Sequence, residues 1–318
     1  MVAMSSNNQN ILITGGAGYL GSVMVPELLA QGHNVTVLDT FMFAQNSLAE
    51  VCHLDNFNVI RGDARDKKLL QKVTKNMDIV IPLAALVGAP LCNRDMIGTV
   101  STNRDAIKTL SDILSPSQKV LMPITNSGYG VGQDGIYCTE ETPLNPISTY
   151  GITKVEAEKI ILERENSMSF RLATVFGMSS RMRLDLLVND FTYRAVNDGF
   201  IVIFEGHFKR NYIHIRDVAN AFIHGIDNFE KMKGEAYNVG LSDANLSKLE
   251  LCDIIKQQVP NFTIMEAEIG KDPDQRNYIV SNEKIETTGF KPKFSLEMGI
   301  KELIKGYTII NNSKFSNI

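Results

Sequence analysis

The chain has 318 residues, of which 44% are hydrophobic and 21% charged, and its formal net charge is −4 at pH 7. Because this length exceeds what one hydrophobic core usually supports, we expect a large unit with a smaller lobe. The slight negative charge excludes long-range attraction of nucleic acid, and the absence of any run of about 18 apolar residues argues against a membrane span.

Short β-rich runs alternate with helix-length amphipathic stretches through the first half, a pattern typical of repeated βαβ units. The predicted strands are Asn10–Thr14, Asn34–Asp39, Phe57–Arg61, Ile79–Ala84, Val120–Thr125 and Ser169–Val175. The predicted helices are Gly21–Gln31, Lys67–Lys75, Thr102–Leu114 and Tyr150–Asn166. The sequence thus predicts an α/β fold with a buried parallel sheet, which binds ligands at the carboxyl ends of its strands.

The alternation weakens after Gly177, where we place the second lobe. A basic stretch, a predicted helix and a predicted strand follow at Ser179–Arg183, Leu184–Asn197 and Phe200–Phe204. The run Tyr212–Ile215 and the helix Arg216–Phe229 indicate a return to the first lobe, and Leu246–Ile310 is mixed α/β. We therefore predict one domain from residues 1–177 and 210–239 and a smaller lobe from residues 178–209 and 240–318.

A glycine-rich loop, Gly15-Gly16-Ala17-Gly18-Tyr19-Leu20-Gly21, joins the first predicted strand to the first helix. Without a Cβ, glycine lets the backbone turn tightly and approach a pyrophosphate at the start of the helix. Asp39 ends the next strand, where its carboxylate can accept hydrogen bonds from an adenosine ribose. No cation follows Asp39 to neutralise a 2′-phosphate, so the pattern favours NAD; a role for Asp39 as a simple cap or turn residue is the alternative.

Two further strand ends are candidates for contact with the cofactor. Asp63 and Ala64 follow the third strand, where they could meet the adenine ring. The small residues of Leu83-Ala84-Ala85 would let a flat cofactor lie close to the sheet, although ordinary helix–sheet packing explains them equally well.

Tyr150 and Lys154 lie one turn apart on the same face of a predicted helix, and Thr125 ends the preceding strand. Proton transfer from a sugar hydroxyl near neutral pH requires a phenol whose pKa lies well below its usual value of about 10. A neighbouring ammonium and an oxidised nicotinamide would both favour the phenolate. A solvated tyrosine beside a surface lysine is the alternative for the pair alone, and the upstream glycine loop favours catalysis.

Taken in order, GGAGYLG, Asp39, Gly62-Asp63, Leu83-Ala84-Ala85, Asn103, Thr125 and YGITK resemble the extended short-chain dehydrogenases/reductases over nearly the whole chain. The resemblance implies a Rossmann-type, doubly wound parallel sheet with a mixed α/β substrate lobe, NAD as cofactor and a nucleotide-sugar substrate. It implies that Thr125 bonds the reacting hydroxyl, Tyr150 is the acid/base, Lys154 holds the nicotinamide ribose and Asn103 belongs to the cofactor site. It also implies a homodimer or dimer of dimers, through helices Thr102–Leu114 and Tyr150–Asn166.

Dehydratases of that family carry Asp-Glu after the catalytic threonine, whereas this chain has Asn126-Ser127, which disfavours water elimination. The stretches Ile81–Cys92, Thr125–Gly130 and Arg181–Phe191 are similar to bacterial enzymes of modified-sugar biosynthesis, including GDP-heptose 4-dehydrogenases.

Arginines are the candidates to bind the substrate diphosphate, because their planar fork can bond two phosphate oxygens at once. The candidates are Arg181, Arg183, Arg210 and Arg276. Arg210 and Arg276 match the family's pyrophosphate arginines by context, and surface salt bridges are the alternative for each. Further candidates for substrate contact are Asn126, Ser127, Thr174 and Asn189, although many relatives carry Asn in place of Thr174.

The five histidines show no metal-ligand spacing, so we predict no catalytic metal. The cysteines lack CxxC spacing, and Met1–Asn10 lacks the basic and apolar regions of a signal peptide. We therefore expect a cytoplasmic protein without nucleic-acid or membrane partners.

The leading hypothesis is NAD-dependent oxidation at C4 of a nucleotide-activated hexose or heptose in bacterial surface-polysaccharide biosynthesis. The 4-keto product would leave from a dehydrogenase or be reduced on its other face by a 4-epimerase, and the sequence does not separate these outcomes. A 4,6-dehydratase is the second enzymatic reading. A non-catalytic NAD-sensing protein is a third, which the intact Thr125, Tyr150 and Lys154 disfavour.

Overall fold

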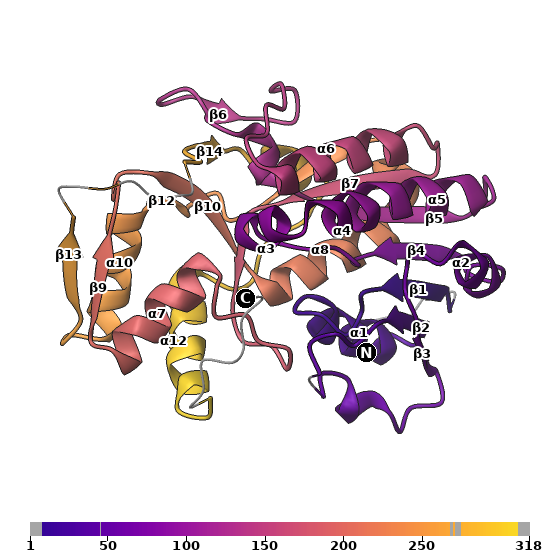
Figure 1. Cartoon of the computed structure of the whole chain (residues 1–318), viewed down its shortest axis with the longest axis horizontal. Helices are drawn as coiled ribbons and strands as arrows, with labels where there is room; N and C mark the ends of the chain where they lie inside the picture. The colour runs from indigo at the N-terminus through magenta and orange to yellow at the C-terminus, as the bar shows by residue number, and fades with distance from the viewer. Residues whose placement is uncertain (1–7, 45, 268–269, 271–274, 311–318) are drawn as a thin grey trace.

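The computed structural model describes residues 8–44, 46–267, 270 and 275–310. Its centre is a seven-stranded sheet in the order β11-β7-β5-β4-β1-β2-β3 (Figure 1), in which every pair is parallel. The strands are β1 (Asn10–Thr14), β2 (Asn34–Asp39), β3 (Phe57–Arg61), β4 (Ile79–Pro82), β5 (Lys119–Thr125), β7 (Ser167–Leu172) and β11 (Ala236–Val239). The chain runs outward from β1 to β3 and then returns to the other side of β1, so the predicted Rossmann-type, doubly wound α/β fold is confirmed.

Helices cover both faces of this sheet. Successive side chains along a strand point to opposite faces, and apolar side chains on both faces of the buried strands need cover. Ile11 and Ile13 of β1 pack on one face with α1 (Gly21–Ala30) and α8 (Ile215–Asp227). Leu12 packs on the other face with three helices. These are α2 (Lys67–Val73), α5 (Ala106–Ile113) and α6 (Thr149–Leu162).

Two predicted elements differ from the structure in their organisation, and several others differ by a few residues at their ends. The helix predicted at Thr102–Leu114 is preceded by α4 (Met96–Val100), and a π-helical turn at Ser101–Asp105 joins α4 to α5. The strand predicted at Ser169–Val175 is divided between two sheets. Ala173 donates the last hydrogen bond of this segment to β11, and β8 (Thr174–Phe176) then pairs with β10 (Lys209–His214).

The second region contains small sheets and three packed helices. The sheets are β12-β10-β8, β13-β9 and β14-β6, with β6 at Tyr137–Cys138, β9 at Phe200–Ile203, β12 at Asn245–Ser247, β13 at Thr263–Glu266 and β14 at Ile279–Val280. The packed helices are α7 (Leu187–Asn197), α10 (Lys248–Gln258) and α12 (Leu296–Tyr307). Shorter helices are α3 (Ala89–Arg94), α9 (Phe229–Met232), α11 (Glu283–Thr287), and 3-10 turns at Ala49–Val51 and Asn126–Tyr129.

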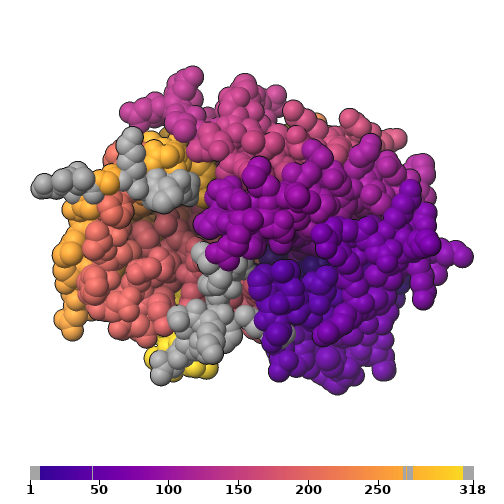
Figure 2. All heavy atoms as spheres, viewed as in Figure 1, coloured from indigo at the N-terminus to yellow at the C-terminus, as the bar shows by residue number. Residues whose placement is uncertain are grey.

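The segment predicted to return to the first lobe contributes to both regions, since β10 joins the small sheet while α8 packs on α1. Figure 2 shows the indigo-to-purple N-terminal residues and the salmon and orange residues of the second region on opposite sides of the molecule. The division at residues 177, 209 and 239 stays a prediction. Within the described ranges, no helix combines the length and apolarity needed to cross a membrane.

Candidate active site

A cleft of about 1130 Å³ opens at the carboxyl ends of the parallel strands and is bordered by the second region. The predicted site residues that line it are Gly15, Gly18, Tyr19, Leu20, Gly21, Asp39, Asp63, Ala64, Leu83, Ala84, Ala85, Thr125, Ser127, Tyr150, Lys154, Thr174, Arg181, Arg183, Arg210 and Arg276. The lining does not include Asn103, Asn126 or Asn189. The fold therefore brings most of the predicted residues to one cleft.

The glycine loop is held by close backbone packing. Gly15 has a left-handed φ of 72°, and a Cβ added there would lie 2.5 Å from the backbone nitrogen of Ala84. A Cβ on Gly21 would lie 2.3 Å from the carbonyl oxygen of Gly16. Since no side chain caps α1, the start of this helix stays accessible to an anionic group. The loop fits the pyrophosphate of NAD.

Asp39 connects the glycine loop to the loop after β2. Its Oδ2 accepts a hydrogen bond from the Ala17 backbone nitrogen at 2.9 Å, and its Oδ1 accepts one from Phe41 at 2.7 Å. Because a carboxylate has about four lone-pair sites, Asp39 can still accept hydrogen bonds from the hydroxyl groups of a ribose. Asp63 lies beside this end of the cleft, where the Arg65 guanidinium at 2.6 Å lowers the pKa of the Asp63 carboxyl.

Asn103 lies behind the cofactor side of the cleft rather than in its wall. It is buried in the π-helical turn, where its Oδ1 accepts a hydrogen bond from the Leu86 backbone nitrogen at 2.8 Å. Its Nδ2 donates to the Leu86 carbonyl oxygen at 2.9 Å. Asn103 therefore fixes the loop that follows β4, and Leu86 itself lines the cleft.

Thr125 and Tyr150 meet where β5 ends and α6 begins. Ser148 caps α6 by accepting a hydrogen bond from the Gly151 backbone nitrogen, which places Tyr150 and Lys154 on the first two turns. The Thr125 hydroxyl is within hydrogen-bonding reach of the Tyr150 phenol and donates to Ser127 Oγ at 2.9 Å. Ser127 Oγ also accepts from Nη1 of Arg276. This arrangement can orient a sugar hydroxyl at the phenol.

Burial raises the pKa of Tyr150 to about 12, although Arg183, Arg276 and Thr125 each lower it. The sequence analysis expects a pKa below 10 when a neighbouring ammonium and an oxidised nicotinamide both act on the phenol. The cations that lower the pKa of Tyr150 come instead from the second region of the chain. Without a further positive charge, the phenol therefore keeps its proton near neutral pH.

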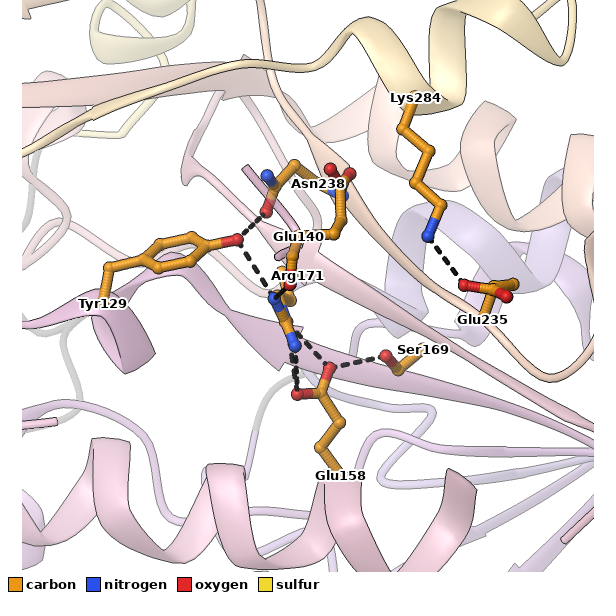
Figure 3. A network of polar contacts seen from close by, with 8 residues as sticks. All are labelled: Tyr129, Glu140, Glu158, Ser169, Arg171, Glu235, Asn238 and Lys284. Atoms are coloured by element: carbon orange, nitrogen blue, oxygen red, sulfur yellow. Dashed lines mark hydrogen bonds and ion pairs between the residues drawn. The ribbon is translucent and has the colours of Figure 1, made fainter. Parts of the chain in front are cut away.

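Lys154 is almost fully buried, and burial lowers its pKa to about 8 against the opposing effect of Glu158. Figure 3 shows Glu158, one turn further along α6, paired with Arg171 of β7 at 3.0 Å. Ser169 also donates to Glu158, and Arg171 donates to the Tyr129 phenol. This buried network fixes α6 to the sheet and so positions Tyr150 and Lys154, the predicted catalytic pair.

The sequence analysis missed Glu158 and the network around it. The available signal is spacing, because Tyr150, Lys154 and Glu158 recur at intervals of one helical turn and therefore share a face of α6. A glutamate on the buried face of a helix requires a partner in the core.

The predicted phosphate-binding arginines occupy different parts of the cleft. The guanidinium of Arg181 lies 3.7 Å from the centroid of the Phe43 ring, on the adenosine side, with Asp39 among the charges that act on it. Arg183 and Arg276 act on Tyr150, whereas Arg210 lies over the Tyr278 ring at 5.5 Å. The charge of Arg183 also acts on Arg181, and contact of the four arginines with a diphosphate stays a prediction.

The predicted residues Tyr19 and Asn189 connect the two regions. The Tyr19 hydroxyl donates to the Gly177 carbonyl oxygen at 2.7 Å, and Asn189 Nδ2 donates to the Tyr19 hydroxyl and to the Arg183 carbonyl oxygen. Asn126 is also buried, and neither polar atom of its amide has a hydrogen-bond partner among the described residues. The side chain of Asn189 thus fixes the Arg183 segment.

The chain is similar to known proteins over most of its length. The model of the NAD dependent epimerase/dehydratase family matches residues 11–240. A low-salt glycan biosynthesis protein of Haloferax volcanii is 28% identical, with 94% of this chain and 98% of the relative covered. A UDP-glucose 4-epimerase of Lactobacillus helveticus is 27% identical, with 89% and 92% covered.

A solved structure has the same fold. The dTDP-glucose 4,6-dehydratase of Bacillus anthracis, in complex with NAD, superposes with a TM-score of 0.82 at 23% identity. The superposition covers 97% of this chain and 98% of the dehydratase. The chain therefore belongs to the NAD dependent epimerase/dehydratase family and is an NAD-dependent enzyme.

Proposed function

We propose that the enzyme oxidises C4 of a nucleotide-activated hexose or heptose, as a 4-dehydrogenase or a 4-epimerase. The observation that carries this proposal is the meeting of Tyr150 with Thr125 at the end of β5, in the same cleft as the glycine loop. NAD supplies the hydride acceptor and a positively charged ring when it is bound. Tyr150 takes the proton of the sugar hydroxyl, Thr125 orients that hydroxyl, and Lys154 holds the nicotinamide ribose.

The arginines next to Tyr150 help it to act as a base. Bringing its pKa from about 12 to neutral pH requires on the order of 7 kcal/mol of differential stabilisation. Because this value already includes the effects of Arg183 and Arg276, the positive charge of the bound cofactor has to supply the remainder. Proton abstraction by Tyr150 therefore depends on the bound cofactor.

Oxidation at C4 followed by loss of water across C5 and C6 is the competing reaction, and the fold shared with a dTDP-glucose 4,6-dehydratase supports it. Elimination needs an acid beside the sugar, but Asn126 and Ser127 supply no carboxyl group. Asp185, which pairs with Arg183, is the candidate acid on that side of the cleft. The absence of the family's Asp-Glu pair favours oxidation without elimination.

The proposal extends to the sugar, the pathway and the oligomeric state. Similarity of Ile81–Cys92 and Arg181–Phe191 to enzymes of modified-sugar biosynthesis supports a GDP-linked heptose, and the glycan-biosynthesis relative supports a role in surface polysaccharides. We also propose a cytoplasmic homodimer or dimer of dimers. Exposed Ile97 on α4 and Ile152 on α6 support contact between subunits at these helices.

The test incubates the purified enzyme with UDP-, GDP-, dTDP- and CDP-sugars and follows the absorbance of bound NADH and the product mass. Loss of two hydrogen atoms shows dehydrogenation, an isomer of unchanged mass shows epimerisation, and loss of water shows elimination. Tyr150→Phe should lower the rate by about 100-fold or more. Tyr137→Phe, at an exposed tyrosine outside the cleft, is the matched control. If no sugar reduces bound NAD, the proposal is wrong.

A further inference from the structure

An ion pair between Arg183 and Asp185 lies in the wall of the cleft. Nη2 of Arg183 donates to Oδ2 of Asp185 at 2.6 Å, and Nε donates to Oδ1 at 3.2 Å. Both side chains are largely buried, with 10% and 17% of their surfaces exposed. Since both residues line the cleft, the exposed part of the pair can meet a ligand.

The pair lies at the reacting end of the cleft. Among the charged groups, Arg183 has the largest effect on the Tyr150 phenol, and it also acts on the Cys92 thiol of α3. A Cβ added to Gly88 would lie 3.9 Å from Nη2 of Arg183. Arg183 therefore extends from the second region toward the loop after β4 and the catalytic tyrosine, where the sugar must lie if Tyr150 reacts with it.

The two side chains present different polar groups to the cleft. Within the described ranges, Nη1 of Arg183 has no recorded hydrogen bond, so its two N–H groups are available to a ligand. Both Asp185 oxygens accept hydrogen bonds from Arg183, and the carboxylate lines the cleft. The site thus offers donors and acceptors side by side, while the opposite charges of the pair offset each other.

We infer that Arg183 and Asp185 recognise hydroxyl groups of the sugar next to its reacting carbon and restrict the enzyme to uncharged sugars. This inference rests on the proposed function. A hydroxyl can accept from Arg183 and donate to Asp185 at once, whereas the carboxylate of a uronic acid only accepts. A uronate would also face the like charge of Asp185 in a largely desolvated wall, and like-charge juxtaposition disfavours binding.

The segment that carries the pair has supports other than the Asp185 side chain. Asn189 Nδ2 donates to the Arg183 carbonyl oxygen at 2.9 Å, and Asn189 Oδ1 accepts from the Gly177 backbone nitrogen at 3.0 Å. Asp185→Asn also preserves the shape of the side chain and one acceptor oxygen. This variant should therefore fold, and it removes the negative charge selectively.

The experiment compares sugars that share a nucleotide and differ at C6 alone, such as UDP-glucose with UDP-glucuronate and GDP-mannose with GDP-mannuronate. We expect the NAD-loaded enzyme to favour the uncharged member by at least about tenfold in kcat/KM. Asp185→Asn should reduce this ratio by about tenfold, mainly through a lower KM for the uronate. Asp190→Asn is the control, because Asp190 pairs with Arg194 outside the cleft lining and should leave the ratio unchanged.

Two results would overturn the inference while leaving the proposed function intact. One is a wild-type enzyme that oxidises the uronate as well as its uncharged counterpart. The other is an equal decrease in kcat/KM for both sugars in the Asp185→Asn variant, which is expected if the ion pair only supports the fold. If no sugar reduces bound NAD, the proposed function fails instead, and calorimetric binding of the same pairs to Tyr150→Phe measures the preference independently of turnover.

Discussion

The two sides of the cleft are built from different kinds of contact. On the cofactor side, Gly15 and Gly21 let backbone segments approach one another more closely than any side chain would permit. On the substrate side, Arg276 of the second region donates to Ser127, and Arg183 pairs with Asp185 two residues along its own segment. Shape thus determines the cofactor side, whereas paired charges and hydrogen bonds determine the substrate side, and the two sides should respond differently to mutation.

The buried network beneath α6 supports both sides, and disrupting it should have the largest effect. Arg171→Met leaves the carboxylate of Glu158 buried and unpaired, which should lower the free energy of unfolding by about 3–5 kcal/mol. Chemical denaturation measures this loss. Adding Glu158→Gln should restore much of it, and a double variant as unstable as the single one would contradict the assigned ion pair.

Gly15→Ala tests the cofactor side alone. The added methyl group would overlap the Ala84 backbone, and alanine would be strained at a φ of 72°, so we expect a loss of about 3 kcal/mol and poor retention of NAD. The matched control is Gly234→Ala, which has a φ of 83° but no atom within 4 Å of the added group. Thermal unfolding and the NAD content of purified protein separate strain from overlap. Equal losses in both variants would show that close packing at Gly15 is unimportant.

This contrast explains how much could be predicted from the sequence. The strands of the sheet and the glycine loop follow from local patterns, because alternation and glycine spacing directly specify backbone geometry. The division of the strand at Ala173 depends on β10, which is distant in the sequence. Likewise, Arg181 stacks on Phe43 and Arg276 bonds Ser127 only because the fold joins distant segments. Residue type showed that arginines were relevant, but not which group each one contacts.

The buried ammonium of Lys154 lets stability and activity be separated by pH. Its pKa falls from 10.5 to about 8, so burial of the charge destabilises the folded state below pH 8, and this penalty is relieved as the pH rises from 8 to 10.5. Lys154→Met should therefore stabilise the protein at pH 7 by at most about 3 kcal/mol, and by progressively less at higher pH. Denaturation at several pH values measures the trend. A stabilisation that does not change with pH would contradict this account. The Lys154→Met variant should be inactive at every pH tested.

The smallest effect is expected where the two sides touch, at the contact between Phe43 and Arg181. Phe43→Ala removes a cation–π contact worth about 1 kcal/mol, so the dissociation constant for NAD should rise about fivefold if the contact helps to close the adenosine end of the cleft. Phe200→Ala, at an exposed phenylalanine outside the cleft lining, is the control. Calorimetric titration of NAD into cofactor-stripped protein distinguishes the variants. Because Asp39 and the glycine loop would remain intact, a much larger loss would mean that the cofactor side also depends on side-chain contacts across the cleft.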